Sequence, residues 1–231
     1  MATDGLKRDA ASAAVDRFVE DGATLGLGSG TTSAFVVGRI GEKLAAGELR
    51  NVRGVPTSES TAALAREAGI TLVGLAEARP TLTLDGADEI GPRLANIKGL
   101  GGALLREKIV AAASRDGLVL VADGSKAVDT LGARGPLPVE VEPFGWETTF
   151  EALSSLGCTP RLRMDATDPG RPFVTDGGHY TADCAFGPIE DPPGLEAAIK
   201  AIPGALECGL FVGLARAAVI ADRDGVRVVE G

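Results

Sequence analysis

The chain is poor in the residues that build metal sites and histidine-based catalytic centres. Its 231 residues include one histidine, His179, and three cysteines, Cys158, Cys184 and Cys208. The cysteines show neither the paired spacing of a zinc site nor the density of a disulfide framework. We therefore expect buried thiols, no metal and no Ser-His-Asp triad, with His179 at the surface of a turn.

Long apolar runs and excess positive charge are also missing. No segment approaches the length of a membrane span, and the N-terminus lacks the pattern of a signal peptide, so we expect no membrane and a cytoplasmic location. The net charge of −9 argues against a nucleic-acid partner, because binding a phosphate backbone needs a basic face. A small phosphorylated metabolite needs only a few local cations and amides, and stays possible.

The first half of the chain alternates helical and strand-like patterns. Continuous apolar strands indicate a sheet covered on both faces, and intervening helices make it parallel. This predicts an α/β fold with a doubly wound, mostly parallel, Rossmann-like sheet. The expected helices are 6–19, 31–44, 58–68 (capped by Ser58) and 103–114, and the expected strands are 24–28, 52–55, 71–75, 81–84 and 118–121.

The pattern changes after Leu131. A glycine- and proline-rich linker is followed by a strand–helix–strand–strand–helix order, which predicts a smaller inserted α+β (ferredoxin-like) domain. The predicted domains are 1–131 with 206–231, and 132–205. The expected segments are a linker at 132–138, a half-buried strand at 137–141, helices at 146–156 and 194–201, a strand at 160–164, a hairpin of 173–175 with 180–186, and closing strands at 217–221 and 226–229 that rejoin the first domain.

Glycine- and hydroxyl-rich residues follow the first predicted strand. Glycine turns let backbone amides approach an anion at a helix N-terminus, and the hydroxyls of Ser29, Thr31 and Thr32 suit a single phosphate. The dinucleotide fingerprint is broken because Thr31 replaces its third glycine, and no lysine closes a P-loop. A tight turn with capping threonines is the alternative.

Charged residues gather after two further strands. Segments 28–32, 85–88 and 123–126 each follow a strand, which places them at one edge of a parallel sheet. Asp85 and Asp88 could face one cleft, or Asp88 could cap the next segment. Lys126 could reach a phosphate, or be a solvated lysine.

Glu107 falls near the first turn of the predicted helix 103–114. Its side chain should lean back toward Lys98 and the glycines at 99–102, where a carboxylate moves protons and an ammonium stabilises an oxyanion. The alternative is an exposed charged face at residues 106–108. Leu104, Leu105, Ile109 and Ala112 are expected core residues of the same helix.

In combination, these segments resemble ribose-5-phosphate isomerase, type A. The resemblance runs almost end to end, in order, through residues 26–32, 54–58, 84–89, 97–109, 121–126, 137–141 with 143, 144 and 146, 174–176 and 209–211. It implies interconversion of ribose 5-phosphate and ribulose 5-phosphate through an enediolate, in the pentose phosphate pathway. No metal or cofactor is implied, and the assembly would be a homodimer or homotetramer.

The resemblance also implies roles for individual residues. Glu107 would move the proton, Asp85 and Lys98 would open the sugar ring and stabilise the oxyanion, and Asp88 would hold hydroxyls. The implied substrate contacts are Lys7, Ser29, Gly30, Thr31, Thr32, Asp85, Gly86, Ala87, Asp88, Lys98, Gly99, Leu100, Gly101 and Lys126.

One position departs from the family pattern, and three other functions stay open. Leu100 stands in a loop that is usually all glycine, so it could narrow the cleft. The main alternative function is a non-catalytic sugar-phosphate-binding regulator domain, although the chain shows no DNA-binding element. A nicotinamide dehydrogenase and a coenzyme A transferase are the other two.

Overall fold

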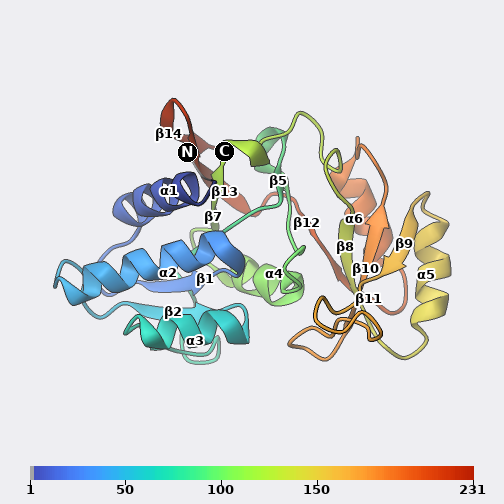
Figure 1. The fold of residues 1–231 in the computed structure, drawn as a ribbon, viewed down its shortest axis with the longest axis horizontal. Helices are drawn as coiled ribbons and strands as arrows, with labels where there is room; N and C mark the ends of the chain where they lie inside the picture. Colours follow the sequence, from blue (N-terminus) through green and yellow to red (C-terminus); the bar gives the residue numbers. More distant parts are fainter. Residues whose placement is uncertain (1–2) are drawn as a thin grey trace. The chain divides into compact units, whose positions relative to one another are not determined.

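The computed structural model describes residues 3–231, which form two compact units (Figure 1). The first unit comprises the chain up to Ala87, Arg106–Ala127 and Gly213–Gly231, and the second comprises Asp88–Leu105 and Val128–Val212. The predicted domain boundaries stay a prediction. The units differ from them chiefly at Asp88–Leu105, because the short strands in that segment pair with a strand from residues 210–211.

The first unit is built on a seven-stranded sheet. Its strand order is β14-β13-β7-β4-β1-β2-β3, and every neighbouring pair is parallel except β13 with β14. The strands are β1 (Thr24–Leu27), β2 (Arg53–Pro56), β3 (Thr71–Leu72), β4 (Leu82–Asp85), β7 (Leu118–Asp123), β13 (Ala215–Asp222) and β14 (Gly225–Glu230). The closing strands thus rejoin the first unit, as predicted.

Helices cover both faces of this sheet. The helices are α1 (Thr3–Phe18), α2 (Gly30–Ala45), α3 (Glu59–Glu67) and α4 (Leu104–Ala113). Leu25 and Leu27 of β1 join one core with α1 and α2, whereas Gly26 between them faces Val110 of α4. Successive residues of a strand point to opposite faces, so α4 covers the face opposite α1 and α2. The doubly wound fold is confirmed.

The start of α3 also follows the prediction. Ser58 is its N-cap, and the Ser58 hydroxyl accepts a hydrogen bond from the Thr61 amide at 3.1 Å. Such a cap satisfies one of the amide groups that a helix N-terminus leaves without a partner, and contributes about 1 kcal/mol.

The orientation of α4 about its axis differs from the prediction. Ile109 is 48% exposed and Ala112 is exposed, so their assignment to the core was wrong. The buried side carries Glu107 and Lys108 next to Val110. Apolar spacing failed to indicate this, because the helix buries two charged side chains where a purely apolar face was expected.

The second unit contains a four-stranded antiparallel sheet with the order β11-β8-β10-β9. Its elements in chain order are β8 (Leu137–Val141), α5 (Trp146–Ser154), β9 (Thr159–Leu162), β10 (Tyr180–Ala185), α6 (Pro192–Lys200) and β11 (Ala205–Cys208). This βαββαβ order confirms the ferredoxin-like prediction. A separate sheet, β12-β6-β5, joins β5 (Glu89–Ile90), β6 (Asn96–Ile97) and β12 (Leu210–Phe211).

Three details of the second unit correct the predictions. All five residues of β8 are buried, and the carboxylate of Glu140 within it accepts from the Thr175 hydroxyl at 2.9 Å. His179 Nδ1 lies 2.8 Å from the same carboxylate oxygen, so the ring of the predicted surface histidine contacts a buried carboxylate. The strand that takes the place of residues 173–175 beside β10 is β9, and residues 173–175 belong to no strand and lead into the turn at 176–178.

The predicted linker at 132–138 is held in place. Buried Glu89 accepts hydrogen bonds from the amides of Gly132 at 2.7 Å and Arg134 at 2.8 Å. A buried carboxylate with two amide donors orders a segment whose composition alone indicates a loop.

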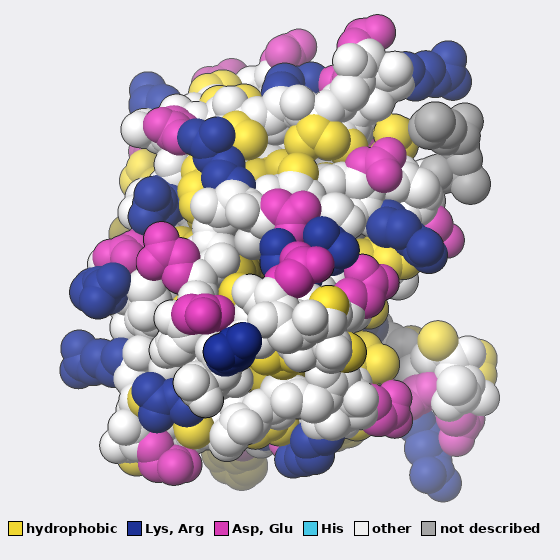
Figure 2. Space-filling model, turned by 90° about the vertical axis from the view of Figure 1, so that its left-hand side faces the viewer, with side chains coloured by type: hydrophobic (Ala, Val, Ile, Leu, Met, Phe, Trp, Pro, Cys, Tyr) yellow, Lys and Arg dark blue, Asp and Glu magenta, His cyan; other side chains and the backbone are white. Residues whose placement is uncertain are grey.

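The three cysteines are buried, as predicted. Across residues 3–231, none of the helices has the length and apolarity needed to cross a membrane. Figure 2 shows one face on which acidic and basic side chains intermingle. Paired charges of this kind include Asp16 of α1, which contacts Arg39 and Lys43 of α2.

Candidate functional site

The carboxyl ends of β1, β4 and β7 lie side by side in the first unit. β4 pairs in parallel with both neighbours, with Leu27 opposite Leu84 and Asp85 opposite Leu120. The segments that follow these strands therefore start from one edge of the sheet, where open α/β folds bind ligands. This is the arrangement that the sequence predicts.

Asp85 is the centre of this edge and is only 1% exposed. Its Oδ1 accepts hydrogen bonds from the Ser29 amide at 3.2 Å, the Ser33 hydroxyl at 3.1 Å and the Gly86 amide at 2.7 Å. Hydrogen bonds to a carboxylate are roughly twice as strong as neutral ones. Asp85 therefore holds the turn after β1 together with its own turn.

The close approach of these two turns requires Gly28. A Cβ at position 28 would lie 2.0 Å from Asp85 Oδ1. We expect Gly28→Ala to push the turn away from Asp85, to lower stability by about 1–3 kcal/mol and to weaken substrate binding. Thermal unfolding and steady-state kinetics would measure both effects.

Gly38→Ala is the matched control for Gly28→Ala. Gly38 is exposed inside α2, and nothing lies within 4 Å of a Cβ there. Alanine should raise stability at this position by roughly 0.5–1 kcal/mol without changing activity. Equal behaviour of the two variants would contradict a specific role for the contact between Gly28 and Asp85.

Hydroxyl groups fix the other side of the turn after β1. The Ser29 hydroxyl lies 2.7 Å from Thr57 Oγ1 and 2.8 Å from Ser58 Oγ, and Thr61 donates to the Gly28 carbonyl at 2.9 Å. Residues 54–58 belong to the family pattern in the sequence, but Thr57 and Ser58 were not predicted as site residues. Their position after β2, the next strand of the sheet, was the signal that could have found them.

The N-terminus of α2 carries a cation close by. The helix begins at Gly30, whose φ of 88° suits glycine, and Lys7 Nζ donates to Thr31 Oγ1 at 3.0 Å. Helix amides, threonine hydroxyls and an ammonium group together form a setting that favours a phosphate.

Glu107 lies in the first turn of α4 and is 5% exposed, with Lys108 at 8%. The alternative of an exposed charged face at 106–108 is therefore wrong for these two residues. Only Arg106 faces outward, where it forms an ion pair with Glu59 at 3.0 Å. Placing a carboxylate in a largely dry environment is costly, and such burial is a frequent mark of functional carboxylates.

The turn after β7 is ordered by its own carboxylate. Asp123 is buried and accepts from the Ser125 amide at 2.9 Å, as the cap of the 3-10 helix η2 (Gly124–Lys126). The side chain of Lys126 is partly exposed at the end of this turn. That Lys126 reaches a bound phosphate stays a prediction.

The second unit holds Asp88, Lys98, Gly99, Leu100 and Gly101 of the predicted site, whereas Thr32 and Ala87 lie in the first unit. Lys98, at the end of β6, is 3% exposed, with its Nζ 5.6 Å from the centre of the Phe211 ring. Asp88 Oδ2 accepts from the Leu100 amide at 3.0 Å, which ties the loop 98–102 to residue 88. Leu100 itself is 47% exposed and Gly101 is exposed.

A possible metal cluster in the second unit includes none of the predicted site residues. In the described chain, three ligand atoms close enough for a cation belong to Glu196, Glu207 and Cys208. The Lys200 ammonium already contacts Glu207 at 2.6 Å, so the charge there has a partner. None of the four is a predicted site residue.

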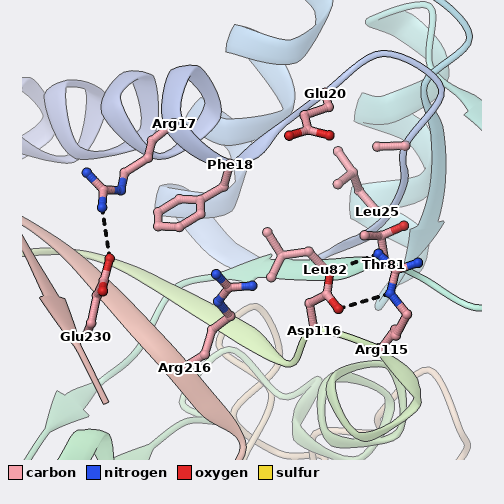
Figure 3. A pocket seen from close by; sticks show the side chains of 11 residues that line it. Arg17, Phe18, Glu20, Leu25, Thr81, Leu82, Arg115, Asp116, Arg216 and Glu230 are labelled. Carbon is pink, nitrogen blue, oxygen red and sulfur yellow. Dashed lines mark hydrogen bonds and ion pairs between the residues drawn. The ribbon is translucent and has the colours of Figure 1, made fainter.

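A cavity of about 450 Å³ opens at the amino ends of β1 and β4, next to Phe18 (Figure 3). Arg17 pairs there with Glu230 at 2.8 Å, and a hydrogen bond from Arg115 lowers the pKa of Asp116. Basic and acidic side chains balance in this cavity, which lacks the unbalanced positive charge expected of a phosphate site.

Comparisons with known proteins decide the family. A model of the family ribose 5-phosphate isomerase A (phosphoriboisomerase A) matches residues 53–225. The chain belongs to this family. Ribose-5-phosphate isomerase A of Gloeobacter violaceus is 54% identical over 231 residues, which cover 99% of this chain and 97% of that protein.

Solved structures of ribose 5-phosphate isomerases agree over the whole chain. A D-ribose-5-phosphate isomerase in complex with phospho-erythronic acid has a TM-score of 0.96 at 36% identity and covers 100% of both chains. Ribose 5-phosphate isomerase from Plasmodium falciparum has a TM-score of 0.94 at 38% identity and covers 99% of both. The resemblance read from the sequence is confirmed.

Proposed function

We infer that this member of the ribose 5-phosphate isomerase A family is an aldose–ketose isomerase that interconverts D-ribose 5-phosphate and D-ribulose 5-phosphate. The observation that carries the inference is the full-length match to relatives of that name at about half identity. A relative's structure contains phospho-erythronic acid, whose carboxylate and phosphate resemble the two anionic ends of a sugar-phosphate enediolate. The alternative of a non-catalytic regulator domain has no comparable support.

Glu107 is the proposed base. It takes the proton from C2 of the open-chain aldose, negative charge gathers on O1, and the proton returns to C1. The C2 hydroxyl becomes the carbonyl as its proton passes to O1. A positioned base of this kind contributes roughly 10²–10⁴-fold in rate, and the burial of Glu107 supports this role.

Lys98, Asp85 and Asp88 are the proposed partners of the base. An ammonium group stabilises the oxyanion that forms on O1, which is the largest electrostatic demand of the reaction. Asp85 assists ring opening. Asp88 orients the substrate hydroxyls through Oδ1, while its Oδ2 accepts from the Leu100 amide. Gly86, Ala87 and the backbone of residues 99–101 complete the proposed substrate contacts.

The phosphate is proposed to bind at the N-terminus of α2. Ser29, Gly30, Thr31 and Thr32 supply amides and hydroxyls, and Lys7 and Lys126 supply charge. The hydrogen bond between Lys7 and Thr31 supports this assignment. We also propose a cytoplasmic homodimer or homotetramer that acts without a metal or cofactor.

Ketose formation from ribose 5-phosphate tests the function directly. Protein treated with a chelator and dialysed should convert ribose 5-phosphate to ribulose 5-phosphate, and should leave unphosphorylated ribose essentially unchanged. Binding of the sugar phosphate without conversion would instead support the regulator. Activity that appears only after a divalent metal is restored would contradict the metal-free mechanism.

A further inference from the structure

We propose that Arg163 is a positioning residue that holds the glycine loop 98–102 in its working shape. The inference rests on the proposed function, because this loop is a substrate-binding segment only if the chain is the isomerase. All the residues involved belong to the second unit. Arg163 directly follows β9 and has no place in the motifs read from the sequence.

The guanidinium of Arg163 contacts two consecutive carbonyl oxygens of the loop. Its Nη1 donates to the Gly99 carbonyl at 2.9 Å and to the Leu100 carbonyl at 3.1 Å. The loop also has other contacts: the Leu100 amide reaches Asp88, the Gly102 amide reaches Gly99, and a Cβ at Gly99 would lie 2.8 Å from Leu104. At Gly101 nothing lies within 4 Å of a Cβ. The arginine therefore bonds the two carbonyls that precede the most open position of the loop.

The arginine is itself held by Asp183 of β10. Nε donates to one carboxylate oxygen at 3.0 Å and Nη2 pairs with the other, which is the two-pronged geometry that favours arginine over lysine. The Arg163 side chain is only 13% exposed and that of Asp183 is 23% exposed. The pair is thus a rigid support within the small sheet.

Phe173 lies close to both the arginine and the loop. The Arg163 guanidinium lies 5.9 Å from the centre of the Phe173 ring. A Cβ on Gly102 would lie 2.4 Å from the same ring, and Gly102 has a φ of 83° that suits glycine. One end of the loop therefore packs on Phe173 while its middle is bonded to Arg163.

Through these contacts, Arg163 should affect catalysis by fixing the position of the loop backbone. Lys98 begins the loop, and its amide is tied to the Gly209 carbonyl at 2.9 Å, so the path of residues 99–101 decides where the loop backbone meets a sugar. A displacement of about 1 Å in a substrate-positioning segment can cost roughly 100-fold in rate. Loss of the arginine should loosen the loop while the sheet beneath it stays folded.

Arg163→Met tests the proposal, because methionine keeps most of the apolar stem and removes every donor. Steady-state kinetics should show kcat/KM lowered at least about 10-fold with a raised KM. Amide hydrogen exchange should be at least about 10-fold faster at Leu100 and Gly102, and unchanged at Val139 and Val141 of β8. A purely structural role would lower the folded fraction and leave KM and the loop amides of the folded protein unchanged.

Arg161→Met is the matched control, since Arg161 lies in β9 two residues before Arg163 and is exposed. It should stay within about twofold of the wild type in every measurement. If Arg163→Met alone fails to fold, the double variant Arg163→Met with Asp183→Asn removes both charges and avoids a buried unpaired carboxylate. That variant should show the same faster exchange in the loop.

Three results would overturn the proposal. They are wild-type kcat/KM in a folded variant, unchanged exchange at Leu100 and Gly102, and equal effects at Arg161 and Arg163. A wild-type protein that fails to isomerise ribose 5-phosphate would refute the proposed function instead, and the exchange data alone would then decide whether Arg163 holds the loop.

Discussion

Glu107→Gln should fold normally and lose at least about 100-fold in kcat. Glutamine keeps the shape of the side chain and one acceptor oxygen but cannot take a proton from carbon, so the loss falls on the chemical step. Substrate binding should change little, because no group proposed to hold the phosphate is altered. Steady-state kinetics in both directions would measure kcat and KM, and circular dichroism with thermal unfolding would verify the fold.

Exchange of the C2 hydrogen gives a second readout for Glu107. In deuterated solvent the wild-type enzyme should incorporate deuterium into the sugar phosphate, and Glu107→Gln should do so at least about 100-fold more slowly. Glu59→Gln is the matched control, because Glu59 is an exposed carboxylate that forms an ion pair with Arg106, the residue before Glu107. Near-wild-type turnover in Glu107→Gln would remove this residue from its role as the base.

Asp85→Ala should impair both stability and activity. The substitution removes Oδ1, the atom that accepts hydrogen bonds from three donors in the wild-type protein. Each buried donor left unsatisfied costs about 1–3 kcal/mol. The turn after β1 would lose its fixed position relative to β4, and we expect kcat/KM to fall at least about 100-fold. Chemical unfolding and steady-state kinetics would give the two numbers.

Asp85→Asn separates the two contributions of this residue. The amide oxygen can still accept from the three donors, so most of the stability should be retained, while the negative charge proposed to assist ring opening is lost. Asp9→Ala is the control, since Asp9 is exposed on α1 and should tolerate alanine. If Asp85→Asn retained full activity, the role of Asp85 would be confined to holding the turn.

The sequence predicted those parts of the fold in which local signals agree with tertiary packing. The apolar strand at 118–121 is buried at every position, and Ser58 caps α3 as its spacing indicates. The edge formed by β1, β4 and β7 also followed from strand order, because parallel strands place their following segments together.

Polar contacts between residues far apart in the sequence could not be predicted from local sequence patterns. The helical period placed Ile109 in the core because apolar spacing carries no information about buried charges such as Glu107. Glu140 was expected to face solvent, since its partners Thr175 and His179 lie 35 and 39 residues away. Arg163 depends in the same way on Gly99, 64 residues distant, and no spacing rule links the two.

The division of the chain into interleaved segments has a consequence for biosynthesis. β13 lies between β7 and β14 in the large sheet, yet it comes from the last segment, Gly213–Gly231. While the ribosome is still making that segment, the buried strand β7 has one edge without its partner strand, and unpaired strand edges favour pairing with other chains. A nascent chain therefore needs β13 (residues 215–222) before this edge of β7 is covered, and a truncation within β13 should yield aggregates rather than a smaller folded protein.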